Sequence, residues 1–279
     1  MSKEMQANIL AGIVANLITT SFITILGVVT FTSIFLVERQ RLLRFFGIHG
    51  NMPKIHIYVS RLQVQPGGTK GAEPLKNGYI GPAIIQIEYL GALLVSRLFR
   101  SKFLALIPQG LKDLLSAVHV TLTDVDITID VSPTLVTDEV LSENLILVGG
   151  GIYNYISLHY LNQQNTPYFF SKNEKGERTL KVRSGIGNIE LEGRSSSREL
   201  AIIERINDSK RGTSIFICAG LGSSASFGSV RYLVQNWKKL QQHYGQAEFA
   251  FCLAFDNQSP DDHSVIEPKR VHEAPMDLV

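Results

Sequence analysis

The sequence predicts an α/β protein in which an N-terminal single transmembrane helix precedes a domain with a mostly parallel sheet. A long uncharged apolar run opens the chain, and short apolar runs typical of buried strands alternate with helical segments after it. Two of those strands end in glycines before a helix. The expected domains are a membrane anchor with a juxtamembrane helix over 1–50, a first α/β unit over 51–143 and a second over 144–279.

The first element is the run from Ile9 to Val37, which contains no charged residue. A run of about 18 apolar residues or more can cross a bilayer as a helix. Signal peptides have a shorter apolar core and a cleavage site of small residues, and Leu36–Arg39 would be a poor cleavage site. Arg39, Arg41 and Arg44 follow the run, and basic flanks are typical of the cytoplasmic side. We therefore expect a single-pass protein of the cell membrane, with its N-terminus outside and its C-terminal domain cytoplasmic.

Small and polar residues recur on one face of this helix, at spacings of three and four: Gly12, Asn16, Thr20, Thr24 and Gly27. Small residues let two helices approach closely, and a buried Asn forms hydrogen bonds between helices. Membrane lipid and other copies of the chain are thus the expected partners, with a homo-oligomer formed through this face. The alternative is that the helix only tolerates these polar residues, since a threonine side chain can form a hydrogen bond to the backbone of its own helix.

Charge and cysteine content narrow the function classes. The formal net charge is +2, and charged residues make up 19% of the chain. Anionic lipid accounts for the arginines beside the anchor, so no nucleic-acid partner is expected. Cys218 and Cys252 lie in apolar runs, where we expect reduced thiols that are near neighbours in the sheet. No Cys/His cluster has ligand spacing, so neither a metal nor a definite cofactor is predicted.

The first α/β unit is predicted to alternate strands and helices. Ile55–Ser60 is a strand, and Pro82–Arg100 is a helix with proline as its first residue. Phe103–Ile107 is a strand and Leu111–Val118 a short helix. Asp124–Val131 alternates polar and apolar residues, which is typical of a half-exposed strand near an edge.

The second unit begins with Asn144–Val148, whose apolar residues are typical of a parallel strand covered on both faces. Tyr153–Gln163 is a predicted helix. Lys172–Arg178 is a charged turn that we expect at a solvated tip, and a hairpin follows through Leu180–Val182 and Ile189–Leu191.

The rest of the second unit supplies the remaining strands. Leu200–Ile206 alternates again, as in a half-exposed strand. Ser214–Ala219 is a buried strand, Ser226–Tyr244 a long helix and Glu248–Phe255 a strand parallel to the first. Val265–His272 is expected to return as an antiparallel edge strand.

Two strand ends form the candidate ligand site. Each leaves an apolar strand through glycines and enters a helix, and open α/β sheets bind ligands at the carboxyl ends of their strands. Glycines let the backbone approach a ligand closely, and the N–H groups at a helix N-terminus favour anions. The residues expected to bind a nucleotide-like or other small anionic ligand are Gly149, Gly150, Gly151, Asn154, Gly220, Gly222, Ser223, Ser224, Ser226 and Gly228. Walker-type and full dinucleotide motifs are absent from the sequence, and glycines that only permit tight turns are the alternative.

A resemblance covers Asn144–Phe255. This block resembles a Rossmann-like domain found in many uncharacterised prokaryotic membrane and regulatory proteins. The shared pattern begins with a strand that ends in Gly-Gly and is followed by an Asn. Next comes an acidic residue that leads a short strand and an Asn. The last part is Ala-Gly, then a Gly, and then Arg, an aromatic residue and Leu. The matching residues are Gly149, Gly150, Asn154, Glu199, Asn207, Ala219, Gly220, Gly228, Arg231, Tyr232 and Leu233. Ala225-Ser226 stands where that family has Gly-Thr. The resemblance implies a Rossmann-like fold and sensing more than catalysis.

Glu88 and Ser60 are the catalytic candidates if the protein is an enzyme. Ser60 ends a predicted strand, and Glu88 lies early in the predicted helix. The pair looks a little like nucleoside-processing Rossmannoid enzymes, in which a carboxylate attacks or polarises a sugar carbon. An early-helix acid stabilised by the helix dipole is the alternative.

Three functions follow from these features. The favoured one is a membrane-anchored signalling protein that senses a ligand in its cytosolic domain and acts through oligomerisation of its transmembrane helix. A membrane-tethered nucleoside- or nucleotide-processing enzyme, by hydrolysis or glycosyl transfer, is the second. A non-catalytic scaffold subunit is the third.

Overall fold

The computed structural model describes residues 3–49, 54–64, 81–100, 125–150, 152–163, 166–184, 187–193, 198–256 and 269–273. The chain divides into two compact units, Met1–Leu42 and Leu43–Val279. The helices are α1 (Lys3–Phe45), α2 (Gln86–Phe99), α5 (Asp138–Leu141), α6 (Tyr155–Leu161) and α7 (Ser223–Tyr244). The strands are β1 (Lys54–Val59), β2 (Arg61–Val64), β3 (Gly81–Ile84), β4 (Asp126–Val131), β5 (Leu145–Val148), β6 (Tyr168–Lys172), β7 (Arg178–Ser184), β8 (Gly187–Gly193), β9 (Arg198–Asp208), β10 (Thr213–Gly220), β11 (Phe249–Asp256) and β12 (Lys269–Glu273).

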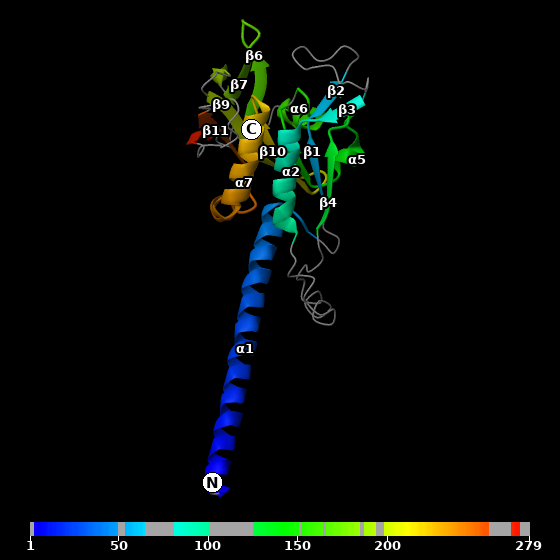
Figure 1. Ribbon diagram of the computed structural model, residues 1–279. Coiled ribbons are helices and arrows are strands. Elements are labelled where there is room, and N and C mark those ends of the chain that lie inside the picture. Colours follow the sequence, from blue (N-terminus) through cyan, green and yellow to red (C-terminus); the bar gives the residue numbers. More distant parts are fainter. Residues whose placement is uncertain are drawn as a thin grey trace. The chain divides into compact units, whose positions relative to one another are not determined.

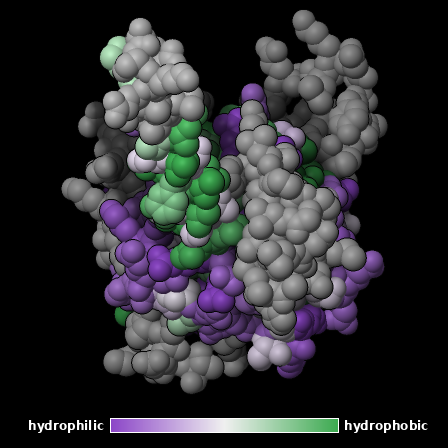
Figure 2. Space-filling model, turned by 90° about the horizontal axis from the view of Figure 1, so that it is seen from below, coloured by the Kyte–Doolittle hydropathy of each residue, from purple (hydrophilic) through white to green (hydrophobic). Residues whose placement is uncertain are grey.

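Helix α1 makes up the first unit and extends by its last turn into the second. Among the described residues it is the one helix long and apolar enough to cross a membrane, over Ile13–Phe45. Most of its large apolar side chains between Ile13 and Val37 are exposed, with Leu17 at 62% and Phe22 at 66%, and the hydrophobic surface in Figure 2 includes this helix. Contiguous exposed apolar surface of this kind marks a contact with a membrane or with another protein.

The second unit is built on a seven-stranded sheet in the order β12-β11-β9-β10-β5-β1-β4. β1 pairs in parallel with β4 and with β5, and β5 pairs in parallel with β10. β9 runs antiparallel to both β10 and β11, and β12 runs antiparallel to β11. The predicted α/β class with a mostly parallel sheet is confirmed, and strands from both expected α/β units join this one sheet.

Helices and a small second sheet cover the two faces of the large sheet (Figure 1). α2 and α7 pack against each other on one face. On the other face, Leu145 and Leu147 of β5 share a core with α6 and with β6 and β7 of the three-stranded sheet β6-β7-β8. Ile146 and Val148 alternate with them and are also fully buried. β5 is therefore covered on both faces, as its apolar run predicts.

Both predicted edge strands are confirmed. β4 is the last strand on one side of the sheet, and its residues alternate between exposed and half-buried. β12 is the last strand on the other side and pairs antiparallel with β11. The period-two pattern was informative in β4 because only one of its faces is covered.

The predicted helix start at Pro82 is wrong. Gly81–Ile84 forms β3, and α2 begins only at Gln86. Pro82 lies opposite Gln63 in a two-stranded sheet, where a missing backbone donor is tolerated. The predicted strand Phe103–Ile107 and helix Leu111–Val118 lie outside the described residues.

β9 differs from its predicted half-exposed character. It is the third strand from one edge, between β10 and β11, and residues from Glu199 to Ile206 are buried. The expectation that Cys218 and Cys252 are near neighbours is also wrong. Cys218 lies opposite Ile203 and Cys252 opposite Ile202, so β9 lies between the two cysteines and their strands are two strand spacings apart, about 10 Å.

The last turn of α1 and the residue after it are part of the core of the second unit. Phe45 and Phe46 are fully buried. The Phe46 ring centroid lies 4.7 Å from that of Phe216 and 5.0 Å from that of Phe99, and Phe45 lies 5.3 Å from Phe216. We call these four residues, with Phe249, the aromatic cluster. Aromatic rings at these separations contribute dispersion as well as buried area.

A glycine ends α1 at this cluster. Gly47 has a φ of +69°, and the Ile48 N–H donates to the Leu43 carbonyl at 2.8 Å. This is the left-handed helix ending that favours glycine. A Cβ on Gly47 would lie only 2.1 Å from Ser214 Oγ, so β10 also excludes a side chain there.

Replacement of Phe46 by alanine should lower the free energy of unfolding by about 3 to 5 kcal/mol, because it leaves a cavity among packed rings. Denaturant unfolding of the full chain in detergent, followed by fluorescence, measures the change. Ile189→Ala is the matched control, because Ile189 is 56% exposed. A similar small loss in both variants would contradict the central place of the aromatic cluster.

Candidate functional site

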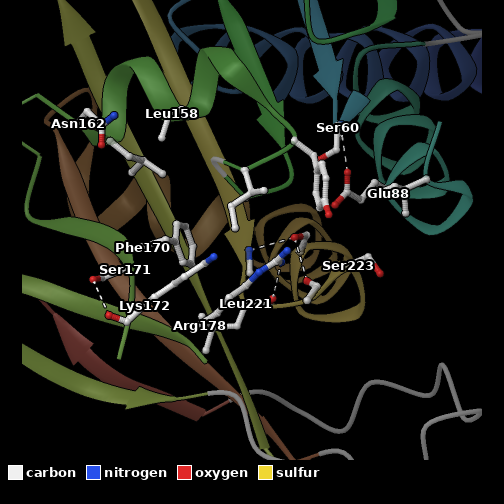
Figure 3. A pocket seen from close by; sticks show the side chains of 18 residues that line it. Ser60, Glu88, Leu158, Asn162, Phe170, Ser171, Lys172, Arg178, Leu221 and Ser223 are labelled. Atoms are coloured by element: carbon white, nitrogen blue, oxygen red, sulfur yellow. Dashed lines mark hydrogen bonds between the residues drawn. The ribbon is translucent and has the colours of Figure 1, made fainter. Parts of the chain in front are cut away.

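A pocket at the carboxyl ends of β1, β5 and β10 brings several predicted site residues together (Figure 3). Its cavity volume is about 390 Å³, near the lower end of the range for small-molecule sites, about 300 to 1,000 Å³. The predicted residues that line it are Ser60, Glu88, Gly150, Gly220, Gly222, Ser223 and Ser226.

Sheet topology explains the position of the pocket. β4 lies on one side of β1, whereas β5 and β10 lie on the other, so the chain reverses its direction of growth across the sheet between β1 and β5. The loops that leave the two strands diverge at such a point and open a crevice. Ser60 at the end of β1, Glu88 in the first turn of α2 and the glycine-rich ends of β5 and β10 therefore belong to one site.

Glu88 lies in the first turn of α2 and is only 3% exposed. The Ser60 N–H donates to Glu88 Oε2 at 3.1 Å. Burial raises the pKa of Glu88 to about 7, although hydrogen bonds from Ser60 act to lower it. A carboxyl that exchanges its proton near neutral pH is suited to proton transfer and to hydrogen bonding with a bound molecule.

Gly149 packs directly against this pair. Its φ is +109°, and a Cβ there would lie 2.1 Å from Ser60 Oγ and 2.6 Å from Glu88 Oε2. Gly149 is not among the residues that line the pocket, and Gly150 is. Gly149 thus makes room for the carboxyl, and this accounts for a glycine at the end of β5.

Ser226 holds the turn between β10 and α7. Its hydroxyl accepts a hydrogen bond from the Gly220 N–H at 3.0 Å and donates one to the Gly222 carbonyl at 3.1 Å. A Cβ on Gly220 would lie 2.5 Å from the Ser226 nitrogen, so strand and helix meet without space for a side chain. Both residues line the pocket, and both are also required by the turn itself.

The start of α7 already has a negative charge beside it. Gly222 is the N-cap residue, and no side chain caps the helix there. A Cβ on Gly222 would lie 2.6 Å from Glu199 Oε1, so the Glu199 carboxylate lies against the helix N-terminus, which it stabilises. An anionic ligand beside Ser223 therefore needs positive charge from elsewhere in the pocket.

That positive charge comes from β6 and β7, which sequence reasoning missed. The sequence predicts that Lys172 and Arg178 lie at a solvated tip, yet both line the pocket. The Arg178 guanidinium lies 5.6 Å from the Tyr153 ring centroid and 3.5 Å from the Leu221 carbonyl oxygen. Within the described part of the chain, neither Lys172 nor Arg178 pairs with a carboxylate. The charges alone are typical of a surface turn, and only the folding of the hairpin beside α6 turns its ends toward the pocket.

Four predicted ligand residues do not line the pocket in the described structure. The Asn154 amide donates to the Tyr58 and Val148 carbonyls at 3.1 and 3.2 Å, so it ties the ends of β1 and β5 together. Gly228 lets α7 approach the sheet, because a Cβ there would lie 2.5 Å from the Phe255 ring. The other two are Gly149, described above, and Ser224, in the first turn of α7. Gly151 lies outside the described residues.

Three sides of the pocket differ in chemistry (Figure 3). Ser60 and Glu88 lie on one side, and Lys172 and Arg178 lie along a second. The third is largely apolar and includes Leu158 and Phe170, with Asn162 beside them. Such a mixture of apolar wall and a few converging polar groups is typical of sites that orient one small molecule.

Replacement of Glu88 by glutamine should remove a pH-dependent loss of stability. The pKa of Glu88 is about 7 in the folded chain against an ordinary value of 4.5. The folded state therefore holds this proton more tightly than the unfolded chain, and the contribution of Glu88 to stability falls as pH rises from about 4.5 to 7. The stability of E88Q relative to the parent should increase over that range, by up to about 3 kcal/mol.

Thermal and denaturant unfolding of both chains between about pH 5 and pH 8 measures this difference. Glu174→Gln, in the exposed β6–β7 turn, is the matched control and should show no such trend. A difference between E88Q and the parent that does not change with pH would contradict the raised pKa.

No family model, no curated protein and no solved structure matches this chain. The resemblance to Rossmann-like ligand-sensing domains therefore stays a prediction that rests on its quoted residues. What the chain binds has to be inferred from the chemistry of the pocket.

Proposed function

We propose that this chain is a membrane-anchored signalling protein whose Rossmann-like cytosolic domain senses a nucleotide-like or other small anionic ligand. The observation that carries the proposal is the pocket in which both glycine-rich strand ends meet Lys172 and Arg178. Cations without carboxylate partners at the edge of an apolar cavity favour an anionic ligand. Arg39, Arg41 and Arg44 after the apolar run favour a cytoplasmic domain, and the exposed Arg41 and Arg44 favour contact with anionic lipid.

The sheet supports a Rossmann-like assignment in part. β4, β1, β5 and β10 form a parallel array with the pocket at its carboxyl ends, as in open α/β folds. The antiparallel strand β9 between β10 and β11 departs from that pattern.

Two helices support a route from the pocket to the end of α1. α2 begins beside Glu88 and ends at Phe99, whose ring lies 5.0 Å from Phe46. α7 begins beside Ser223 and ends at Tyr244, whose ring stacks 4.6 Å from Phe249 in the aromatic cluster. A ligand that binds better to one packing of these helices would therefore also favour one packing around the last turn of α1.

One face of α1 supports self-association as the way in which the protein signals. This is the face of small and polar residues that we expect to pack against another copy of the chain. Thr24 Oγ1 donates to the Thr20 carbonyl at 2.8 Å, so this hydroxyl is satisfied within its own helix. Asn16 is exposed and has no hydrogen-bond partner among the described residues. Around Gly27, a Cβ would meet no described atom within 4 Å, which leaves room for a second helix. In lipid, an unpaired amide favours hydrogen bonds to a neighbouring helix.

Asn16→Leu should weaken self-association in a bilayer by about 1 kcal/mol, which is about fivefold in the dissociation constant. Crosslinking or single-molecule counting of the full chain in vesicles measures it. Ile25→Leu is the matched control, because nine residues place Ile25 on the opposite face of the helix.

The sensing role predicts that at least one of a panel of nucleotides, sugar phosphates, dicarboxylates and sulfate changes the oligomer distribution in these vesicles. Arg178→Gln should abolish that response, and Lys175→Gln, in the exposed turn of the same hairpin, should keep it. If no anion on the panel changes the distribution, the sensing role is wrong and a scaffold role is favoured.

A nucleoside- or nucleotide-processing enzyme is the second candidate, and Glu88 is the observation that favours it. A buried carboxyl with a pKa of about 7 beside Ser60 can donate a proton to a leaving group or, when ionised, attack a sugar carbon. This function predicts release of free base from nucleosides or nucleotides, and Glu88→Gln should lower the rate by about 100-fold or more. Glu174→Gln should leave it unchanged, and absence of any product would remove this candidate.

A further inference from the structure

We propose that the ligand of this pocket is a ribonucleoside phosphate, with its phosphate at Lys172 and Arg178, its ribose hydroxyls at Glu88 and Ser60, and its base against Leu158 and Phe170. The inference rests on the proposed function, in which this pocket binds a small anionic molecule. It adds the chemical class of that molecule and its orientation.

The phosphate position follows from the distribution of charge. Glu199 already lies against the start of α7, so the helix N-terminus alone offers little positive potential to an anion. Lys172 and Arg178 line the pocket without a carboxylate partner among the described residues. A guanidinium fork matches the oxygens of a phosphate. Ser223, in the first turn of α7, also lines the pocket and adds a hydroxyl to it.

The position of the ribose hydroxyls follows from the polar side of the pocket that carries no described cation. Glu88 and Ser60 lie together on one side of the pocket, bonded through the Ser60 N–H. A carboxylate accepts two hydrogen bonds side by side, which matches the adjacent hydroxyls of a ribose. No described cation contributes to the electrostatic environment of Glu88, so this side does not favour a second anion.

The base position follows from the apolar side. Leu158 comes from α6 and Phe170 from β6, and they lie on a different side of the pocket from Glu88 (Figure 3). A half-buried aromatic ring beside aliphatic side chains provides a surface for a planar heterocycle. Asn162 borders this side and offers an amide that can bond to the edge of a base. The three sides thus match the three parts of one nucleotide, and the cavity of about 390 Å³ admits one small molecule.

Calorimetric titration of the full chain in detergent with AMP, GMP, CMP and UMP tests the proposal. The tightest of these is then compared with its nucleoside, its 2′-deoxy form and ribose 5-phosphate. The parent chain should prefer the nucleotide over each analogue by about tenfold to a hundredfold, since each analogue lacks one of the three contacts.

Each variant should remove one preference and keep the other two. Arg178→Gln should bind nucleotide and nucleoside equally, Glu88→Gln should bind the ribo and deoxy forms equally, and Phe170→Ala should bind nucleotide and ribose 5-phosphate equally. Lys175→Gln should behave as the parent. Unfolding curves confirm that each variant is folded, and Phe170→Leu replaces Phe170→Ala if the latter is not.

The outcomes separate this inference from the proposed function. If ribose 5-phosphate or inorganic phosphate binds in an Arg178-dependent way and no nucleotide binds more tightly, the nucleoside assignment is overturned and anion sensing stands. If nucleotides bind but the preferences survive the three variants, the orientation is overturned. If no probe binds and no anion alters the oligomer, both proposals fail.

Discussion

The parallel pairing of β1, β5 and β10 brings the ends of three strands together at the pocket. Val59 lies opposite Val148, and Val148 lies opposite Cys218, so the last residues of β1 and β5 lie level with Cys218, two residues before the end of β10. The Gly149 N–H continues the ladder with a 2.9 Å bond to the Cys218 carbonyl. Ser60 follows β1, Gly150 lies two residues after β5, and Gly220 is the last residue of β10, and all three line the cavity. A shift of one residue in any of these strands would turn its side chains to the opposite face.

Close packing beneath the pocket explains why glycines recur there. Gly149 makes room for the carboxyl of Glu88, and Gly222 makes room for the carboxyl of Glu199. Each of the two helices that start at the pocket therefore has a carboxyl in or against its first turn. The helix dipoles are used within the fold, and the positive side chains that line the pocket are Lys172 and Arg178.

Charged residues inside β9 show how firmly this part of the sheet is enclosed. Glu204 is fully buried, and burial raises its pKa to about 8 although Arg183 acts to lower it. Arg205, on the opposite face, lies 5.8 Å from the Phe45 ring centroid and 5.6 Å from that of Phe216, and donates to the Gly245 carbonyl at 3.0 Å. This arginine links the aromatic cluster to the end of α7. Its burial costs less because Nη1 donates a hydrogen bond and its planar face lies against two aromatic rings.

The sequence by itself determined the apolar N-terminal helix, the α/β class, the strand character of β1, β4 and β5, and the glycine-rich ends of β5 and β10. These features are local, because run length, periodicity and glycine placement are read within a few residues. The sequence indicates Glu88 and Ser60 as one candidate site and the glycines as another. Strand order in the folded sheet brings them into one site with Gly150 and Gly220.

Only the tertiary structure decided the burial of β9, the separation of Cys218 from Cys252, and the approach of Lys172 and Arg178 to the pocket. Each depends on which strand or hairpin lies next to which, a relation between residues far apart in the chain. A charged turn has the same sequence pattern whether it lies in solvent or beside a cavity, because the contacts that distinguish the two come from other elements.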